Sequence, residues 1–128
     1  MPGNSAKEES HAAGIKQFHR RRLNSDFLPF DPHILGFIND YQVRVAKFGA
    51  KFGAKFDWHT HRNEDEGFLV LQGKISLDCR DGSVQLREGE FLVIPRGAEH
   101  RSRSLTEEPI VLTCEPNSTV NTAMRKAT

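Results

Sequence analysis

The sequence is poor in the residue types that support disulfide-bonded and redox-active proteins. Its 128 residues include two cysteines, one tryptophan, one tyrosine and two methionines. Cys79 and Cys114 lie in separate apolar runs and form no Cys-x-x-Cys pair. This arrangement argues against a zinc knuckle or a redox pair and favours buried, reduced thiols.

Neither sign of charge is in excess. Eighteen Lys and Arg residues oppose 17 Asp and Glu residues, which gives a formal net charge of +1 and a pI near 7.9. A chain with this balance has no global field to recruit nucleic acid or a membrane surface. The basic cluster at residues 19–22 lacks interleaved aromatic residues, so we expect a solvated arm and no nucleic-acid partner.

Long hydrophobic runs are also missing. No stretch approaches the length of a membrane span, and residues 1–10 lack the apolar core of a secretory signal. We therefore expect a soluble, cytoplasmic protein with no membrane partner.

The chain does contain short apolar runs separated by turn residues. A chain of 128 residues has the size of one domain. From Tyr41 onward the runs recur about every ten residues, which is typical of an all-β sandwich or barrel. Asp81-Gly82 is suited to a hairpin turn. The predicted strands cover residues 41–48, 50–61, 66–72, 74–79, 84–87, 90–94, 99–104 and 110–114.

The polar ends of the chain suggest its domain limits. Residues 1–26 have no sustained apolar period and are predicted to form a mostly disordered, flexible N-terminal tail. Residues 27–122 form the predicted domain, and residues 123–128 a short C-terminal tail. Closure of the strands into a barrel would remove their exposed edges.

A four-residue unit is repeated in tandem. Lys-Phe-Gly-Ala occupies residues 47–50 and again 51–54, and a third copy begins at Lys55. Such a repeat preserves the two-residue period of a strand, so Phe48, Phe52 and Phe56 would share one face. The segment is either a lengthened strand at the barrel mouth or a tolerated duplication whose extra residues bulge out of the sheet. We favour the second interpretation.

Three histidines and one carboxylate form a candidate metal site. His59 and His61 project to the same face of a strand, and Glu66 follows a charged loop that can turn the chain back toward them. His100 would arrive from a later strand. Imidazole and carboxylate ligands together favour iron, manganese, nickel, copper or zinc over calcium or magnesium.

The spacing of these residues resembles the two motifs of the cupin superfamily. The first motif corresponds to His59-x-His61, four residues, Glu66, six residues and a glycine. The second is a glycine, then Pro-x-Gly and His100, with Ser104 where the family usually has asparagine. Residues 115–122 also resemble small single-domain cupins that are similar to mannose-6-phosphate isomerase. The resemblance implies a single jelly-roll barrel, commonly a homodimer. It also implies one divalent transition metal held by His59, His61, Glu66 and His100.

The walls of the expected pocket do not identify a substrate. The residues predicted to line it share the facing of Glu66 or His100: Phe68, Val70, Gln72, Ser102 and Ser104. We find no second carboxylate or lysine placed as a general base, so no catalytic residue is assigned. The resemblance implies either a dioxygenase or isomerase-like enzyme acting on a small molecule, or a non-catalytic cupin that binds or senses one.

Overall fold

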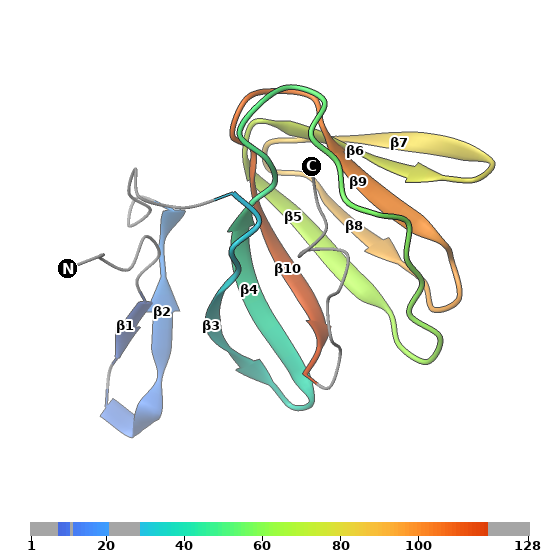
Figure 1. Ribbon diagram of the computed structural model, residues 1–128. Coiled ribbons are helices and arrows are strands. Elements are labelled where there is room, and N and C mark those ends of the chain that lie inside the picture. The colour runs from blue at the N-terminus through green and yellow to red at the C-terminus, as the bar shows by residue number, and fades with distance from the viewer. Residues whose placement is uncertain (1–7, 11, 21–28, 118–128) are drawn as a thin grey trace.

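The computed structural model describes residues 8–10, 12–20 and 29–117, and their regular secondary structure is almost entirely β (Figure 1). The predicted all-β class is confirmed. One short 3-10 helix, η1 (Ala12–Gly14), interrupts the strands. The strands are β1 (Glu8–Ser10), β2 (Lys16–Phe18), β3 (His33–Ile38), β4 (Tyr41–Lys47), β5 (Glu66–Gln72), β6 (Lys74–Cys79), β7 (Gly82–Arg87), β8 (Phe91–Ile94), β9 (His100–Ser104) and β10 (Ile110–Pro116).

The strands of the barrel form two antiparallel sheets. One sheet has the order β3-β4-β10-β5-β8, and the other has the order β7-β6-β9. In Figure 1 they lie across from each other as the two walls of the barrel. Apolar side chains from both sheets meet between them and form the core: Ala46, Phe68, Val70, Ile75, Leu77, Leu86, Ile94 and Val111.

Alternation along β10 determines which of its side chains enter the barrel. Val111 belongs to the core between the sheets, whereas Leu112 packs on the outer face of the larger sheet. Thr113 and Glu115 follow Val111 at two-residue intervals and line the interior cavity. This strand therefore carries a carboxylate into the barrel.

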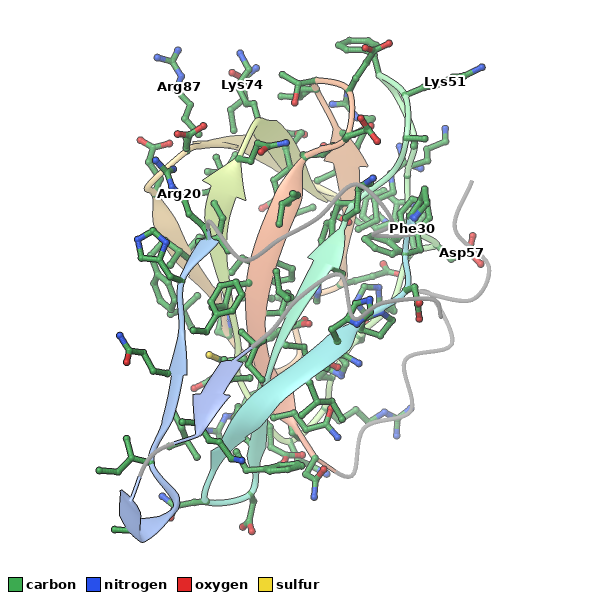
Figure 2. The ribbon with its side chains drawn as sticks, turned by 90° about the vertical axis from the view of Figure 1, so that its left-hand side faces the viewer. Arg20, Phe30, Lys51, Asp57, Lys74 and Arg87 are labelled. Atoms are coloured by element: carbon green, nitrogen blue, oxygen red, sulfur yellow. The ribbon has the colours of Figure 1, made fainter. Side chains whose placement is uncertain are left out.

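The described part of the N-terminal segment contains two short strands. Strands β1 and β2 form an antiparallel hairpin that lies beside β3 (Figure 1). Phe18 packs against a second apolar cluster that contains Leu35 and Val45, and Arg20 pairs with Glu88 at 3.0 Å. Figure 2 shows Arg20 on the same side of the molecule as Lys74 and Arg87.

Residues 8–10 and 12–20 are thus the described part of the segment that was predicted to be mostly disordered. The apolar face of β3 and β4 gives Phe18 a surface to cover, which composition alone does not reveal. Residues 1–7, 11, 21–28 and 118–128, including the predicted C-terminal tail, lie outside the described residues.

The repeated segment is a loop, and the strand predicted for residues 50–61 is absent. Gly49 and Gly53 have φ values of 107° and 88°, which end the extended conformation after β4. Phe48 and Phe56 are buried with their rings 4.7 Å apart, whereas Phe52 is 68% exposed. The three phenylalanines therefore do not share a face, and the middle copy of the unit projects outward.

Ser104 anchors this loop. Its hydroxyl donates a hydrogen bond of 2.7 Å to the carbonyl of Lys51, and its amide donates one of 2.7 Å to the carbonyl of Ala54. Figure 2 shows the Lys51 side chain extending away from the barrel. Serine thus makes a structural hydrogen bond at the position where the second motif usually has asparagine.

Candidate metal centre

His59 and His100 are held together through their backbones. The amide of His59 donates to the carbonyl of His100 at 2.9 Å, and the amide of His100 donates to the carbonyl of His59 at 3.0 Å. This isolated antiparallel bridge joins the segment between β4 and β5 to the first residue of β9. It places the two rings 4.3 Å apart.

The structure gathers the four predicted ligands at one end of the barrel. One donor atom each from His59, His61, Glu66 and His100 lies within 4.8 Å of the others. Glu66 begins β5 and His100 begins β9, so both sheets contribute to the cluster. Oε1 of Glu66 lies 3.1 Å from Nε2 of His100 and 3.2 Å from Nε2 of His61.

Backbone carbonyls orient two of the imidazole rings. Nδ1 of His59 lies 3.1 Å from the carbonyl oxygen of Asp57, and Nδ1 of His100 lies 2.9 Å from that of Ala98. Because a carbonyl oxygen only accepts, both Nδ1 atoms carry the proton in these contacts. Nε2 is then the nitrogen of each ring that is left to face a metal ion, the arrangement typical of metal-binding histidines.

The surroundings of the His61 ring show whether these residues suit a bound cation. Nε2 of His61 is buried and has no hydrogen-bond partner, because its 3.2 Å contact with Glu66 lacks hydrogen-bond geometry. A buried ring nitrogen without a partner is costly. A cation at this point would satisfy it together with the carboxylate. Three imidazoles and one carboxylate are also the donor set that suits a divalent transition metal, so the residues fit.

The charges at the cluster favour the metal-binding protonation states of Glu66 and His59, but they favour the protonated form of His61. Burial alone would raise the pKa of Glu66, but the contacts with His100 and His61 outweigh it and bring the pKa to about 2. Burial lowers the pKa of His59, while contact with Glu66 raises the pKa of His61. Glu66 is therefore ionised and His59 neutral near pH 7, as ligands must be.

The cavity beside the cluster is small and mostly aromatic. Its volume is about 10 Å³, room for roughly one water molecule. Three predicted ligands line it together with six further residues: His59, Glu66, His100, Phe48, Phe56, Phe68, Ser102, Thr113 and Glu115.

Two of the five residues expected to line the pocket do so, namely Phe68 and Ser102. Val70 is fully buried in the core, because it lies further along β5 from the cluster. Gln72, at the end of β5, is exposed and donates to the carbonyl of Glu108 at 3.4 Å. Ser104 is buried but binds the loop of residues 48–58 and not the cavity.

Sequence reasoning missed a buried ion pair at the cavity. Glu115 is 1% exposed, and its Oε1 accepts a hydrogen bond from Nη2 of Arg44, which is itself buried. The alternation of residues 110–115 was the available signal, since Glu115 shares the facing of Val111. The expectation that the walls lack a second carboxylate is corrected by this residue.

Trp58 lies next to the site but outside the cavity. The guanidinium carbon of Arg80 lies 3.9 Å from the centre of the indole, and that of Arg101 lies 4.8 Å from it. The ring is thus covered by two cations on the outer side of the smaller sheet. Its neighbour His59 faces inward, as alternation requires.

Comparison with known proteins identifies the family. Residues 49–114 match the family described as the cupin domain, a match that covers more than half of the 128 residues. The chain therefore belongs to the cupin family.

Individual relatives agree with this assignment. A cupin-2 domain containing protein from Shewanella frigidimarina is 34% identical, with a TM-score of 0.62 over 70% of this chain and 82% of that one. A protein from Neisseria meningitidis is 30% identical, with a TM-score of 0.56 over 69% and 86% of the two chains. KdgF from Halomonas sp., at 22% identity and a TM-score of 0.56, shares the fold over 66% of this chain and 76% of its own.

The curated relatives are matched over part of their length. The uncharacterized protein YdbB of Bacillus subtilis is 40% identical over 68 residues, which are 52% of this chain and 57% of that protein. An uncharacterized protein of Aquifex aeolicus is 37% identical over 54 residues, which are 42% of this chain and 45% of that protein. The chain thus spans about half the length of the curated relatives it matches.

Proposed function

We propose that this cupin binds one divalent transition metal ion and uses it to hold a small molecule at the end of the barrel. His59, His61, Glu66 and His100 would be the ligands, and iron, manganese, nickel, copper or zinc the ion. The observation that carries the proposal is the buried Nε2 of His61, which has no hydrogen-bond partner and lies with three other donor atoms within 4.8 Å.

The protein residues would prepare the site for chemistry on that molecule. Such an ion supplies Lewis acidity or redox chemistry. Glu66 contributes the negative charge that offsets the cation. Phe48, Phe56 and Phe68 keep bulk water out of the cavity, which strengthens electrostatic interactions inside it. The proposal covers dioxygenase and isomerase-like reactions.

The second candidate is a cupin that binds or senses a small molecule without turnover. The observation in its favour is the cavity volume of about 10 Å³, which leaves little room for a substrate unless the aromatic walls move. Oxygen uptake by the metal-loaded protein in the presence of catechols, thiols or diketones would favour the dioxygenase. Stoichiometric ligand binding without product formation would favour the binder.

Metal analysis tests the site itself. We expect the purified protein to contain about one transition-metal ion per chain, and His59→Ala or His100→Ala to weaken metal binding by at least about 100-fold, since loss of a ligand should exceed the 10- to 100-fold effect of an outer-shell partner. His33→Ala is the matched control, because this histidine lies on β3, outside the cluster. Equal metal content in wild type and all three variants, measured by elemental mass spectrometry, would exclude the proposed ligands.

A further inference from the structure

Two hydrogen bonds join the turn between β8 and β9 to the loop that connects two of the proposed ligands. The amide of Gly97 donates to the carbonyl of His61 at 2.8 Å. The amide of Arg96 donates to Oδ1 of Asp65 at 2.9 Å, and Asp65 directly precedes Glu66. The turn therefore holds both ends of this loop, and a proposed ligand lies at each end.

The same turn orients the ligand that follows it in the chain. The amide of Ala98 donates to the carbonyl of Pro95 at 3.2 Å, which closes the turn. The carbonyl of Ala98 in turn accepts the hydrogen bond of 2.9 Å from Nδ1 of His100. One short turn thus fixes the position of His100 relative to the two ligands on the neighbouring loop.

A third hydrogen bond reaches that loop from β4. The hydroxyl of Tyr41, the first residue of the strand, donates to the carbonyl of Asp65 at 2.9 Å. Nε of Arg96 also lies 3.5 Å from Oδ1 of Asp65. The side chains of Asp65 and Arg96 are 46% and 63% exposed, so water screens their charges. The hydrogen bonds, more than the ion pair, therefore fix the backbone next to Glu66.

We propose that Asp65 is a positioning residue for the metal site, and that by accepting the amide of Arg96 it holds Glu66 beside His61 and His100. The inference deepens the proposed function and rests on it. What matters is the acceptor Oδ1 and not the charge of the carboxylate. Because the ligands are held together by the fold before the ion arrives, loss of this hydrogen bond should weaken metal binding without unfolding the barrel.

Nickel titration tests the proposal. Protein without a polyhistidine tag is stripped of metal with a chelator and titrated with nickel chloride in a calorimeter. We expect Asp65→Ala to raise the dissociation constant for nickel about 10- to 100-fold, the effect typical of an outer-shell partner. Asp65→Asn keeps Oδ1 as an acceptor and should bind nickel within about threefold of wild type, since an exposed charge contributes little.

Glu64→Ala is the matched control for charge. It removes a carboxylate from the same loop, and none of the three hydrogen bonds that hold the loop involves its side chain. Its nickel affinity should also stay within about threefold of wild type. The metal-free forms of Asp65→Ala and Glu64→Ala should unfold at the same urea concentration, and a lower midpoint for Asp65→Ala would assign its loss of affinity to folding.

Further outcomes separate this inference from the proposed function. Wild-type nickel affinity in Asp65→Ala overturns the positioning role, and so does an equal loss of affinity in Asp65→Asn or Glu64→Ala. If Asp65→Ala does not fold, Tyr41→Phe decides, because it removes only the hydroxyl that holds the carbonyl of Asp65. Affinity about 10-fold weaker than wild type supports the proposal, and unchanged affinity overturns it. A wild type that binds no nickel refutes the metal site and with it both proposals.

Discussion

At the scale of single residues, Asp78 has the densest polar surroundings of the described aspartates outside the metal centre. The hydroxyls of Ser76 and Ser83 donate to it at 2.7 and 2.8 Å, and Nε of Arg101 and Arg103 lie 3.3 and 3.1 Å away. Burial would raise the pKa of this carboxyl, but the hydrogen bonds from Arg103 and the two serines hold it well below its usual range.

Removal of this charge should change both stability and its pH dependence. We expect Asp78→Asn to lower the free energy of unfolding at pH 7 by about 1–3 kcal/mol. Because the pKa is lower in the folded state, the stabilisation is complete above the unfolded value of about 3.9 and is lost as the pH falls below it. Urea denaturation at pH 7 and pH 3 should therefore show a smaller loss on acidification for Asp78→Asn than for wild type.

The exposed Asp81→Asn is the control for this comparison and should follow the wild type at both pH values. If Asp78→Asn loses as much stability between pH 7 and pH 3 as the wild type does, the ionisation of Asp78 contributes nothing to stability.

The sequence predicts those residues of the candidate site whose spacing along the chain forms a recognisable motif. His59, His61 and Glu66 are close in sequence, and the structure brings them together with His100. Arg44 and Glu115 are 71 residues apart, so their pairing depends on the register between β4 and β10. No local pattern specifies that register.

At the scale of elements, the duplicated unit illustrates the limit of period-based prediction. A four-residue repeat is compatible with a strand, but two glycines with positive φ convert it into a loop. The copies differ in their contacts: Phe48 and Phe56 pack inside the barrel, and the rings of Phe30 and Phe56 have centres 4.6 Å apart. Phe52, by contrast, is exposed and does not join this buried group.

Deletion of residues 51–54 should be tolerated. The deletion leaves one Lys-Phe-Gly-Ala unit before Lys55, so Ala50 can occupy the place of Ala54 against Ser104. We expect soluble protein, nearly unchanged metal content and a loss of less than about 1.5 kcal/mol, in line with the small cost of altering exposed loops. Phe56→Ala, by contrast, should cost about 3–5 kcal/mol because it empties a buried site. Insoluble protein on deletion, found by fractionation and urea denaturation, would show that the extra unit is required for folding.

At the scale of the whole molecule, the proposed metal site would connect parts of the barrel that are distant in sequence. Its four residues lie at the start of β5, at the start of β9 and in the segment between β4 and β5. The jelly-roll barrel expected from the motifs is the fold observed, because alternating strands and turns specify it at many positions. The homodimer stays a prediction. Among the described residues, no helix has the length and apolarity needed to cross a membrane.

Metal binding should therefore stabilise the folded chain as a unit. At a free metal concentration 100 times the dissociation constant, the free energy of unfolding should rise by about 2.7 kcal/mol. The melting temperature should then increase on the order of 10 °C for a domain of this size. Thermal denaturation of metal-free protein with and without added ion measures the shift, and His61→Ala should show almost none. A shift of equal size in that variant would place the ion elsewhere.

The position of Trp58 has a practical consequence. It is the chain's single tryptophan, it precedes His59 directly, and two guanidinium groups cover its ring. Its fluorescence therefore arises from one location only, at the end of the barrel where the proposed ligands converge. A paramagnetic ion such as copper or nickel bound at the site would lie near this indole and quench its fluorescence. The emission of the unlabelled protein can therefore follow metal binding in real time.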